Sequence, residues 1–215
     1  MIKKGLTVYS GIIISFIVLI VILGSIRFLD AEIAVRVMHF LQSLHTLHQA
    51  TEDIPDLLVY LVIFGTTIMW IIYFYRSHEN KHDITMKFLK LAATALPIAY
   101  LMKSFFQFMF GRTPTRVFVQ AHQPLIFNWF HGIGFGCFPS GHMTVFTAFG
   151  IAIWIYYPQY RRPVFITLLL LGAALIATDY HFLSDVIAGA YLGILITYFL
   201  LYAFKRLEEK PNHFS

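Results

Sequence analysis

The stretch Leu6–Ile26, LTVYSGIIISFIVLIVILGSI, runs for 21 residues without a charged side chain. An α-helix needs about 20 mostly apolar residues to cross the hydrocarbon core of a bilayer, so this stretch predicts a membrane-spanning helix. The apolar core of a signal peptide is shorter and is followed by a cleavage site of small residues, and this stretch has neither feature. We therefore expect the helix to be retained.

Five further apolar stretches follow along the chain. They are Leu57–Tyr75, Phe88–Phe110, Met143–Tyr160, Val164–Thr178 and Val186–Phe204. The fourth and fifth of the six stretches are the shortest, and a short helix can still cross where its ends lie inside a bundle. The pattern predicts an all-α fold, a polytopic membrane bundle of six transmembrane helices that forms a single domain over residues 1–215.

The composition excludes several classes of protein. Hydrophobic residues make up 58% of the chain and charged residues 13%, whereas a soluble domain is nearer half apolar and one quarter charged. A water-soluble globule is therefore excluded. The single cysteine, Cys137, allows no internal disulfide. In so apolar a chain, the net charge of +5 fits basic residues that flank membrane spans, so nucleic acid is not an expected partner.

Basic residues are distributed unevenly between the two ends of the predicted helices. If the N-terminus is cytoplasmic, 11 of the 16 Lys and Arg residues lie on the cytoplasmic side. The others are Arg27, Arg36, Lys103, Arg112 and Arg116. Because cytoplasmic loops are enriched in Lys and Arg, we predict that both termini are cytoplasmic. The segment Arg27–Asp56 then lies outside, with a helical stretch near Val35–Leu47 along the interface.

Three groups of polar residues fall at the outer ends of the last four predicted helices. The first is Phe138-Pro139-Ser140-Gly141-His142, which predicts a helix start with Ser140 as the N-cap. Free backbone N–H groups and the positive end of the helix dipole favour an anion there, and Gly141 lets the backbone approach that anion closely. An ordinary helix cap with His142 at the interface explains the same residues, so this motif alone decides nothing.

The second group is His181-Phe182-Leu183-Ser184-Asp185, between the last two predicted helices. On a helix, residues i and i+4 share a face, so the Asp185 carboxylate can accept a hydrogen bond from one nitrogen of His181. The other imidazole nitrogen is then available as a nucleophile. The alternative is that Asp185 caps the last helix and has no catalytic role.

The third group consists of the cations Lys103, Arg112 and Arg116. An ionisable residue inside an apolar helix, as Lys103 is, marks a candidate functional site. Nine residues of helix would turn Arg112 to the opposite face, so the chain must leave the helix between them, and Gly111 and Pro114 supply the break. Cations at an anion-binding helix end are typical of a phosphate pocket. The alternative is a set of interfacial side chains that snorkel to water.

These three groups resemble the signatures of the type 2 phosphatidic acid phosphatase family, which shares its site with bacterial acid phosphatases and vanadium haloperoxidases. The family signatures are Lys-x6-Arg-Pro, Pro-Ser-Gly-His and Ser-Arg-x5-His-x3-Asp. Residues 139–142 match the second in full, and His181-x3-Asp185 matches the end of the third. The resemblance extends over about Lys103–Gly189 and implies a phosphatase-like core at about residues 88–204.

The resemblance also implies a role for each residue. His181 would attack phosphorus and form a phosphohistidine, Asp185 would orient it, and His142 would protonate the leaving oxygen and then activate water. The phosphoryl oxygens would be held by Lys103, Arg112 and the backbone amides of Ser140 and Gly141. No metal and no cofactor is implied, because cations and amides neutralise the phosphoryl charge.

The chain departs from the family signatures at two positions. The first signature appears here as Lys103-x8-Arg112-Thr113-Pro114, and Gln107, one turn along from Lys103, is the other candidate for its Lys position. In the third signature, Leu175 stands where the family has Arg, unless Arg116 supplies that charge from the loop. Sphingomyelin and inositol phosphorylceramide synthases also keep the two His and the Asp without this Arg, and they transfer a phosphoryl headgroup to an alcohol.

We therefore expect an integral-membrane lipid phosphate phosphatase, a phosphoric monoester hydrolase acting on a lipid phosphomonoester or diphosphate. Its site would face the extracytoplasmic side of the bilayer in a multi-pass protein, and the short loops favour a bacterial inner membrane. A headgroup phosphotransferase with the same residues is the alternative. An inactive relative or a transporter is the third hypothesis, although transporters place their charges near the membrane midplane.

Overall fold

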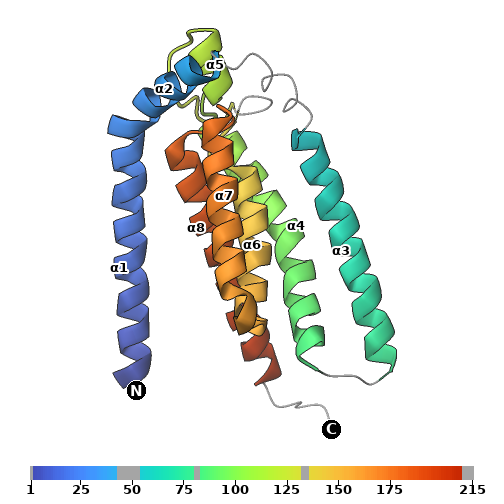
Figure 1. Ribbon diagram of the computed structural model, residues 1–215. Coiled ribbons are helices and arrows are strands. Elements are labelled where there is room, and N and C mark those ends of the chain that lie inside the picture. The colour runs from blue at the N-terminus through green and yellow to red at the C-terminus, as the bar shows by residue number, and fades with distance from the viewer. Residues whose placement is uncertain (1, 43–53, 80–82, 132–135, 210–215) are drawn as a thin grey trace.

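The computed structural model describes residues 2–42, 54–79, 83–131 and 136–209 (Figure 1). Within these ranges the chain is helical and contains no strand, so the all-α prediction is confirmed. The elements are α1 (Ile2–Gly24), the π-helical turn η1 (Ser25–Leu29), α2 (Asp30–Gln42), α3 (Ile54–His78), α4 (Ile84–Phe110), α5 (Thr115–Gln120), α6 (Gly141–Tyr156), the 3-10 turn η3 (Pro158–Tyr160), α7 (Arg161–Ala177) and α8 (Leu183–Glu208).

The long helices alternate in direction. In Figure 1, α1, α4 and α7 run upward, and α3, α6 and α8 run downward. As a result, α1 begins and α8 ends at the same end of the molecule. The short helices α2 and α5 lie at the opposite end, which we call the upper end.

Five helical segments of the described chain are long and apolar enough to cross a membrane. They are Tyr9–Phe40, Leu57–His78, Ile84–Phe110, Pro158–Ala177 and Leu183–Glu208. The fourth predicted crossing corresponds to α6, which has only 16 residues. Much of α6 is buried between its neighbours, from Gly141 to Ala152, and a short helix can cross where protein surrounds it. The number of crossings and the cytoplasmic location of the termini stay predictions.

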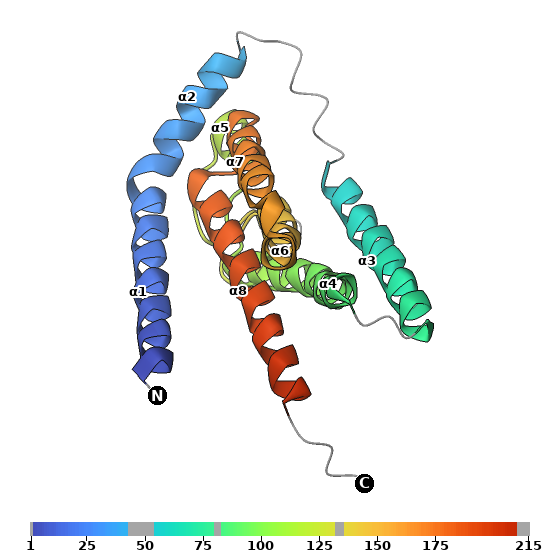
Figure 2. The ribbon, with the colours of Figure 1, turned by 60° about the horizontal axis from the view of Figure 1, so that its bottom comes forward.

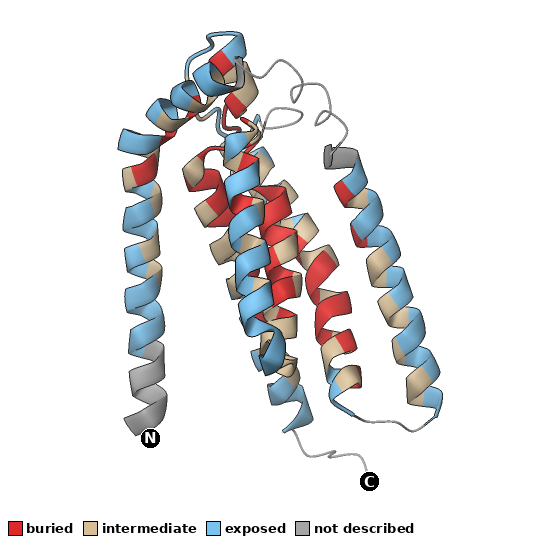
Figure 3. Cartoon of the chain, in the orientation of Figure 1, coloured by how far each residue is buried: buried red, intermediate tan, exposed pale blue. Residues whose placement is uncertain are grey.

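The core of the bundle lies between α4, α6 and α8, where the buried residues concentrate (Figure 3). Many of them are small, such as Ala92 and Ala95 on α4 and Ala148 and Ala152 on α6. Small side chains let helix backbones approach closely, which is how helices associate in a membrane. In contrast, α1, α3 and α7 expose large apolar side chains on their outer faces, as lipid-facing helices do.

Replacing Gly193 by alanine is expected to destabilise the contact between α6 and α8. A Cβ atom at Gly193 would lie 2.5 Å from the Thr144 carbonyl oxygen and 2.9 Å from the Ala148 nitrogen. Both are backbone atoms, so the helices would have to separate, and such overpacking costs about 1–3 kcal/mol. Thermal unfolding in detergent would measure the loss. The matched control is Gly65→Ala on α3, where a Cβ atom would meet nothing within 4 Å; an equal melting temperature for both variants would contradict this packing.

The first helix stands apart from the bundle over most of its length, and α2 bends away from it at the upper end (Figures 1 and 2). A hydrogen bond of 2.5 Å joins the hydroxyls of Ser15 on α1 and Tyr191 on α8. The helix predicted near Val35–Leu47 is present as α2, but it begins earlier, at Asp30, directly after the π-helical turn. Residues 43–47 lie outside the described residues.

Candidate functional site

The start of α6 has the geometry that its sequence predicts. Ser140 is the N-cap, and its Oγ accepts a hydrogen bond of 3.3 Å from the Met143 amide. The Ser140 amide itself donates to the carbonyl oxygen of Asp185 at 3.0 Å and so ties the start of α6 to the start of α8. The Gly141 amide occupies the first helical position, where an N–H has no acceptor within its own helix.

His181 and Asp185 are close together, although not through the helical spacing that their sequence separation predicts. Helix α8 begins at Leu183, so His181 precedes it and Asp185 lies in its first turn. Asp185 Oδ2 accepts a hydrogen bond of 3.1 Å from the Phe182 amide and lies 3.5 Å from His181 Nδ1. The carboxylate lies beside one imidazole nitrogen because the chain turns into α8 between the two residues. Among the described residues, however, His181 Nδ1 has no hydrogen-bond partner, so the predicted hydrogen bond to Asp185 is not formed.

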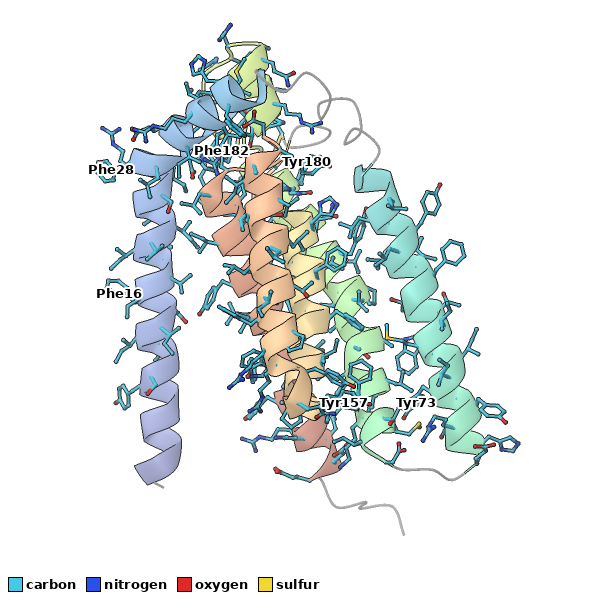
Figure 4. The ribbon with its side chains drawn as sticks, viewed as in Figure 1. Phe16, Phe28, Tyr73, Tyr157, Tyr180 and Phe182 are labelled. Carbon is cyan, nitrogen blue, oxygen red and sulfur yellow. The ribbon has the colours of Figure 1, made fainter. Side chains whose placement is uncertain are left out.

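The two histidines face the same small space at the upper end. Their ring centroids are 6.5 Å apart, and both rings contact the ring of Tyr180, at 5.4 Å from His142 and 5.1 Å from His181. Both histidines are buried, at 6% and 5% exposure. Tyr180 and Phe182 mark this region in Figure 4, at the top of α7 and α8.

Lys103 lies against the start of α6. Its Nζ donates a hydrogen bond of 3.3 Å to Gln107 Oε1. It also lies so near Gly141 that a Cβ atom added there would be 3.5 Å from Nζ. The amide of Gln107 donates in turn to the Pro139 carbonyl at 3.1 Å. Of the two candidates for the first-signature Lys, Lys103 is thus the one whose charge reaches the helix end, while Gln107 holds the loop before it.

Arg112 is buried completely and binds two carboxylates. Its Nη1 donates to Ser184 Oγ at 2.7 Å and to Asp185 Oδ1, and its Nη2 donates to Asp30 Oδ2 at 2.6 Å. Burial by itself lowers the pKa of Arg112, but the charges of Asp185 and Asp30 outweigh burial and raise the pKa above its ordinary value. The predicted contact between Arg112 and phosphate stays a prediction; the structure shows both terminal nitrogens bound to protein acceptors.

Asp30 was not indicated by any sequence signature. It lies 82 residues before Arg112 and 154 before Ser184, yet it contacts both and is 1% exposed. The only signal in the sequence is an acidic residue shortly after the uncharged stretch Leu6–Ile26, with Arg27 between them. That signal does not distinguish a buried carboxylate from an interfacial one, because nothing local shows that α2 turns toward α8.

The other predicted cation, Arg116, lies above the end of α7. Its guanidinium is 5.2 Å from the centre of the Tyr180 ring, and its Nη2 is 3.5 Å from the Thr178 carbonyl oxygen. Leu175, which replaces the signature Arg, packs in an apolar cluster with Met143 and Val186. The position is therefore filled by an apolar side chain, and Arg116 is the cation that lies nearest to Tyr180 among those described here.

Cys137 lies close to the site without the properties of a nucleophile. Burial raises the pKa of its thiol well above the usual range, and the charge of Asp185 adds to the increase. Its Sγ donates to the Thr113 carbonyl at 3.3 Å. Because the thiolate is the reactive form of cysteine, Cys137 does not compete with the histidines for that role.

An apolar groove of about 640 Å³ lies next to the histidines. Its lining comes from α1, α6, α7 and α8, with Val18, Ala173 and Ile176 among its walls. Met143 and Val186 also line it, and they directly follow His142 and Asp185 in the chain. The groove therefore begins one residue along the chain from His142 and from Asp185.

Among the residues that the structure describes, no group of three or more His, Cys, Asp or Glu side chains has the arrangement of a metal site. The model of the PAP2 superfamily matches residues 88–209, more than half of the chain. No curated protein and no solved structure matches the chain. The matched segment contains both histidines, Asp185 and the three predicted cations, but not Asp30.

Proposed function

Because the chain belongs to the PAP2 superfamily, whose members are phosphatases, we propose that it is an integral-membrane lipid phosphate phosphatase. The observation that carries the proposal is the pair of buried histidines beside the start of α6. His181 has a carboxylate at its Nδ1, and His142 lies across from it at a ring separation of 6.5 Å. Lys103 approaches the same helix end.

The reaction follows from the roles these groups can take. His181 Nε2 attacks phosphorus while the bond from phosphorus to the lipid oxygen breaks, and His142 donates its proton to that oxygen. His142 then accepts a proton from water, the water oxygen attacks phosphorus, and the bond from phosphorus to His181 breaks to release phosphate. Asp185 stabilises the positive charge on His181 during the first step.

The phosphoryl oxygens are neutralised in this proposal by charge and by backbone dipoles. Lys103 and the Gly141 amide lie at the positive end of α6, where an anion is stabilised. Arg116 approaches from the side of Tyr180. A contact between Arg112 and phosphate would require a phosphoryl oxygen to replace one of its protein acceptors, Asp30, Ser184 or Asp185. Such fixed donors supply most of what phosphoryl transfer requires, namely positioning and electrostatic stabilisation.

The apolar groove supports a lipid as the substrate. Along α8 it extends from Leu183 to Ile194, a rise of about 16 Å. The hydrocarbon core of a bilayer is about 30 Å thick, so the groove matches the depth of one leaflet. A lipid whose phosphate lies between the histidines would place a hydrocarbon chain along this groove. We propose that the site faces the extracytoplasmic leaflet of a bacterial inner membrane, in keeping with the distribution of Lys and Arg.

Filling the groove tests this substrate class. Replacing Ala173 by tryptophan is expected to lower kcat/KM for a long-chain phosphatidic acid at least about tenfold, because an occupied apolar pocket discriminates strongly by size. Hydrolysis of a small soluble phosphate ester should not change. Leu170→Trp is the matched control, since Leu170 is exposed on α7 outside the groove. If Ala173→Trp lowered kcat/KM equally for the lipid and for the small soluble ester, the groove would not be the binding site of the lipid chain.

The proposed function itself is tested by phosphate release in detergent with EDTA present. The panel contains phosphatidic acid, phosphatidylglycerol phosphate, a polyprenyl diphosphate and a phosphorylated glycolipid. We expect release from at least one lipid, inhibited by vanadate as a mimic of the phosphoryl group in transfer. Activity that requires an added divalent metal would contradict the proposal.

A headgroup phosphotransferase is the second candidate, and Leu175 favours it. The synthases that transfer a headgroup to an alcohol also lack this Arg, and here the position is closed by apolar packing. In a transferase, an added lipid alcohol would accept the phosphoryl group and free phosphate would stay low. Product formation that is independent of every alcohol supplied would exclude this candidate.

A further inference from the structure

Asp30 is a buried carboxylate that reaches the candidate site from outside the segment matched by the family model. It begins α2, directly after the π-helical turn Ser25–Leu29. In a regular α-helix, residues 25 and 30 would point about 140° apart. The wider π-helical turn, with its hydrogen bonds from i to i+5, instead brings them to one face. Ser25 and Asp30 are accordingly both buried, at 2% and 1% exposure.

Asp30 supplies the cap that the start of α8 lacks. The N-cap position is occupied by Phe182, whose side chain has no hydrogen-bonding atom. Asp30 Oδ1 accepts a hydrogen bond of 3.0 Å from the Ser184 amide, and Oδ2 accepts one of 2.5 Å from the Ser184 hydroxyl. A carboxylate at a helix N-terminus satisfies free amides and interacts favourably with the dipole. Here that carboxylate comes from another helix.

Asp30 also holds the far side of Arg112. The Arg112 guanidinium lies between Asp30 and Asp185 and is enclosed by the rings of Phe182, Phe127 and Phe138, at 4.3, 5.3 and 5.8 Å. Among the described residues, Arg112 Nε has no hydrogen-bond partner, and the two carboxylates and Ser184 provide the polar contacts of the guanidinium. Removing one carboxylate would leave the guanidinium without half of its anchoring.

These contacts end at the catalytic pair. Asp185 uses Oδ1 for Arg112 and turns Oδ2 toward His181 Nδ1. Both Arg112 and the first turn of α8, which carries Asp185, are held by Asp30. We propose that Asp30 is a positioning residue: it keeps Asp185 aimed at His181 through Arg112 and Ser184, without touching the substrate. The kcat measurement that tests this role rests on the proposed phosphatase function, whereas the position of Asp185 relative to His181 can be measured without it.

The test compares Asp30→Asn with Glu32→Gln. Glu32 is an acidic residue on the same helix, but it is exposed and pairs with Arg36 within α2. A misplacement of about 1 Å in a catalytic group costs on the order of 10²-fold in rate. We therefore expect Asp30→Asn to lower kcat by about 10- to 100-fold with KM nearly unchanged, and Glu32→Gln to match the wild type.

A double variant tests whether Asp30 acts through Arg112. Asp30→Asn leaves Arg112 paired with Asp185 alone, whereas Asp30→Asn combined with Arg112→Gln leaves the Asp185 carboxylate buried without its cation, so the melting temperature is measured for each variant beside kcat. If both residues act through Asp185, the double variant should be no slower than the slower single variant. Losses that multiply would show that the two residues act separately, and would overturn the proposal.

A readout that does not depend on activity completes the test. In protein labelled with ¹⁵N-histidine, the His181 nitrogen resonances report whether the Asp185 carboxylate still lies beside Nδ1. Asp30→Asn should shift or broaden the His181 signals, whereas Glu32→Gln should not. If wild-type protein hydrolyses no lipid phosphate but the His181 signals still shift, the proposed function fails and the positioning role stands. Unchanged His181 signals and unchanged kcat in Asp30→Asn would overturn the positioning role of Asp30.

Discussion

Replacing His181 by alanine is expected to lower phosphate release from the lipid substrate by at least about 10⁴-fold, because without the proposed nucleophile no phosphohistidine can form. The wild-type enzyme should also retain labelled phosphorus on one histidine after rapid quenching, and the label should be lost in acid and kept in base, as a phosphorus–nitrogen bond behaves. His181→Ala should show no label. Both effects are measured with the same radiolabelled substrate.

His131→Ala is the control for this prediction. His131 is exposed at the upper end, and its Nδ1 lies 2.7 Å from the Trp129 carbonyl oxygen. It has no contact with Asp185 among the described interactions. This variant should keep both the activity and the label. Labelled phosphorus on His181→Ala, or substantial release by it, would show that another residue attacks phosphorus.

Replacing His142 by glutamine is expected to lower kcat by about 10²- to 10⁴-fold, the contribution typical of a positioned acid and base. The loss should depend on the leaving group. The leaving group of an aryl phosphate is a phenolate, which departs without being protonated. His142→Gln should therefore still form the phosphohistidine from an aryl phosphate and release one equivalent of phenol in a burst. Hydrolysis of the intermediate needs the base, so the label should then accumulate on His181.

The contrast between substrates makes this prediction specific to His142. An alkyl phosphate needs protonation of its leaving oxygen, so the same variant should show no burst with phosphatidic acid. His131→Gln should behave as the wild type with both substrates. If His142→Gln gave equal rates for the aryl and alkyl esters and no accumulated label, its role as acid and base would be refuted.

The helical fold could be predicted from the sequence because lipid exposure leaves a local signature. A backbone in hydrocarbon must satisfy its own hydrogen bonds, so uncharged runs such as Leu6–Ile26 and Val186–Phe204 indicate helices by themselves. The start of α6 could be predicted for the same reason, because Pro139, Ser140 and Gly141 act on the next turn of the same helix. The predicted stretch Met143–Tyr160 extended past the end of α6 at Tyr156, because Pro158 cannot continue the helix.

The candidate site was predictable only as far as its motifs extend. Pro-Ser-Gly-His and His-x3-Asp place the two histidines and Asp185. A break after α4, the third long helix, separates Arg112 from Lys103. The partners of Arg112 were not predictable, because charge and spacing do not show whether an arginine faces phosphate or a carboxylate. Leu175 was recognised as a departure, but only the packing shows that the position is closed.

The sequence by itself therefore determined the helices and indicated the candidate site residues, since each depends on contacts within one turn or on one short motif. Only the tertiary structure decided that Asp30 caps α8, that Arg112 lies between Asp30 and Asp185, and that an apolar groove is lined by the residues that follow His142 and Asp185 in the chain. These features join segments up to 154 residues apart. Their free energy comes from burial and from charge pairing between helices, which no local pattern records.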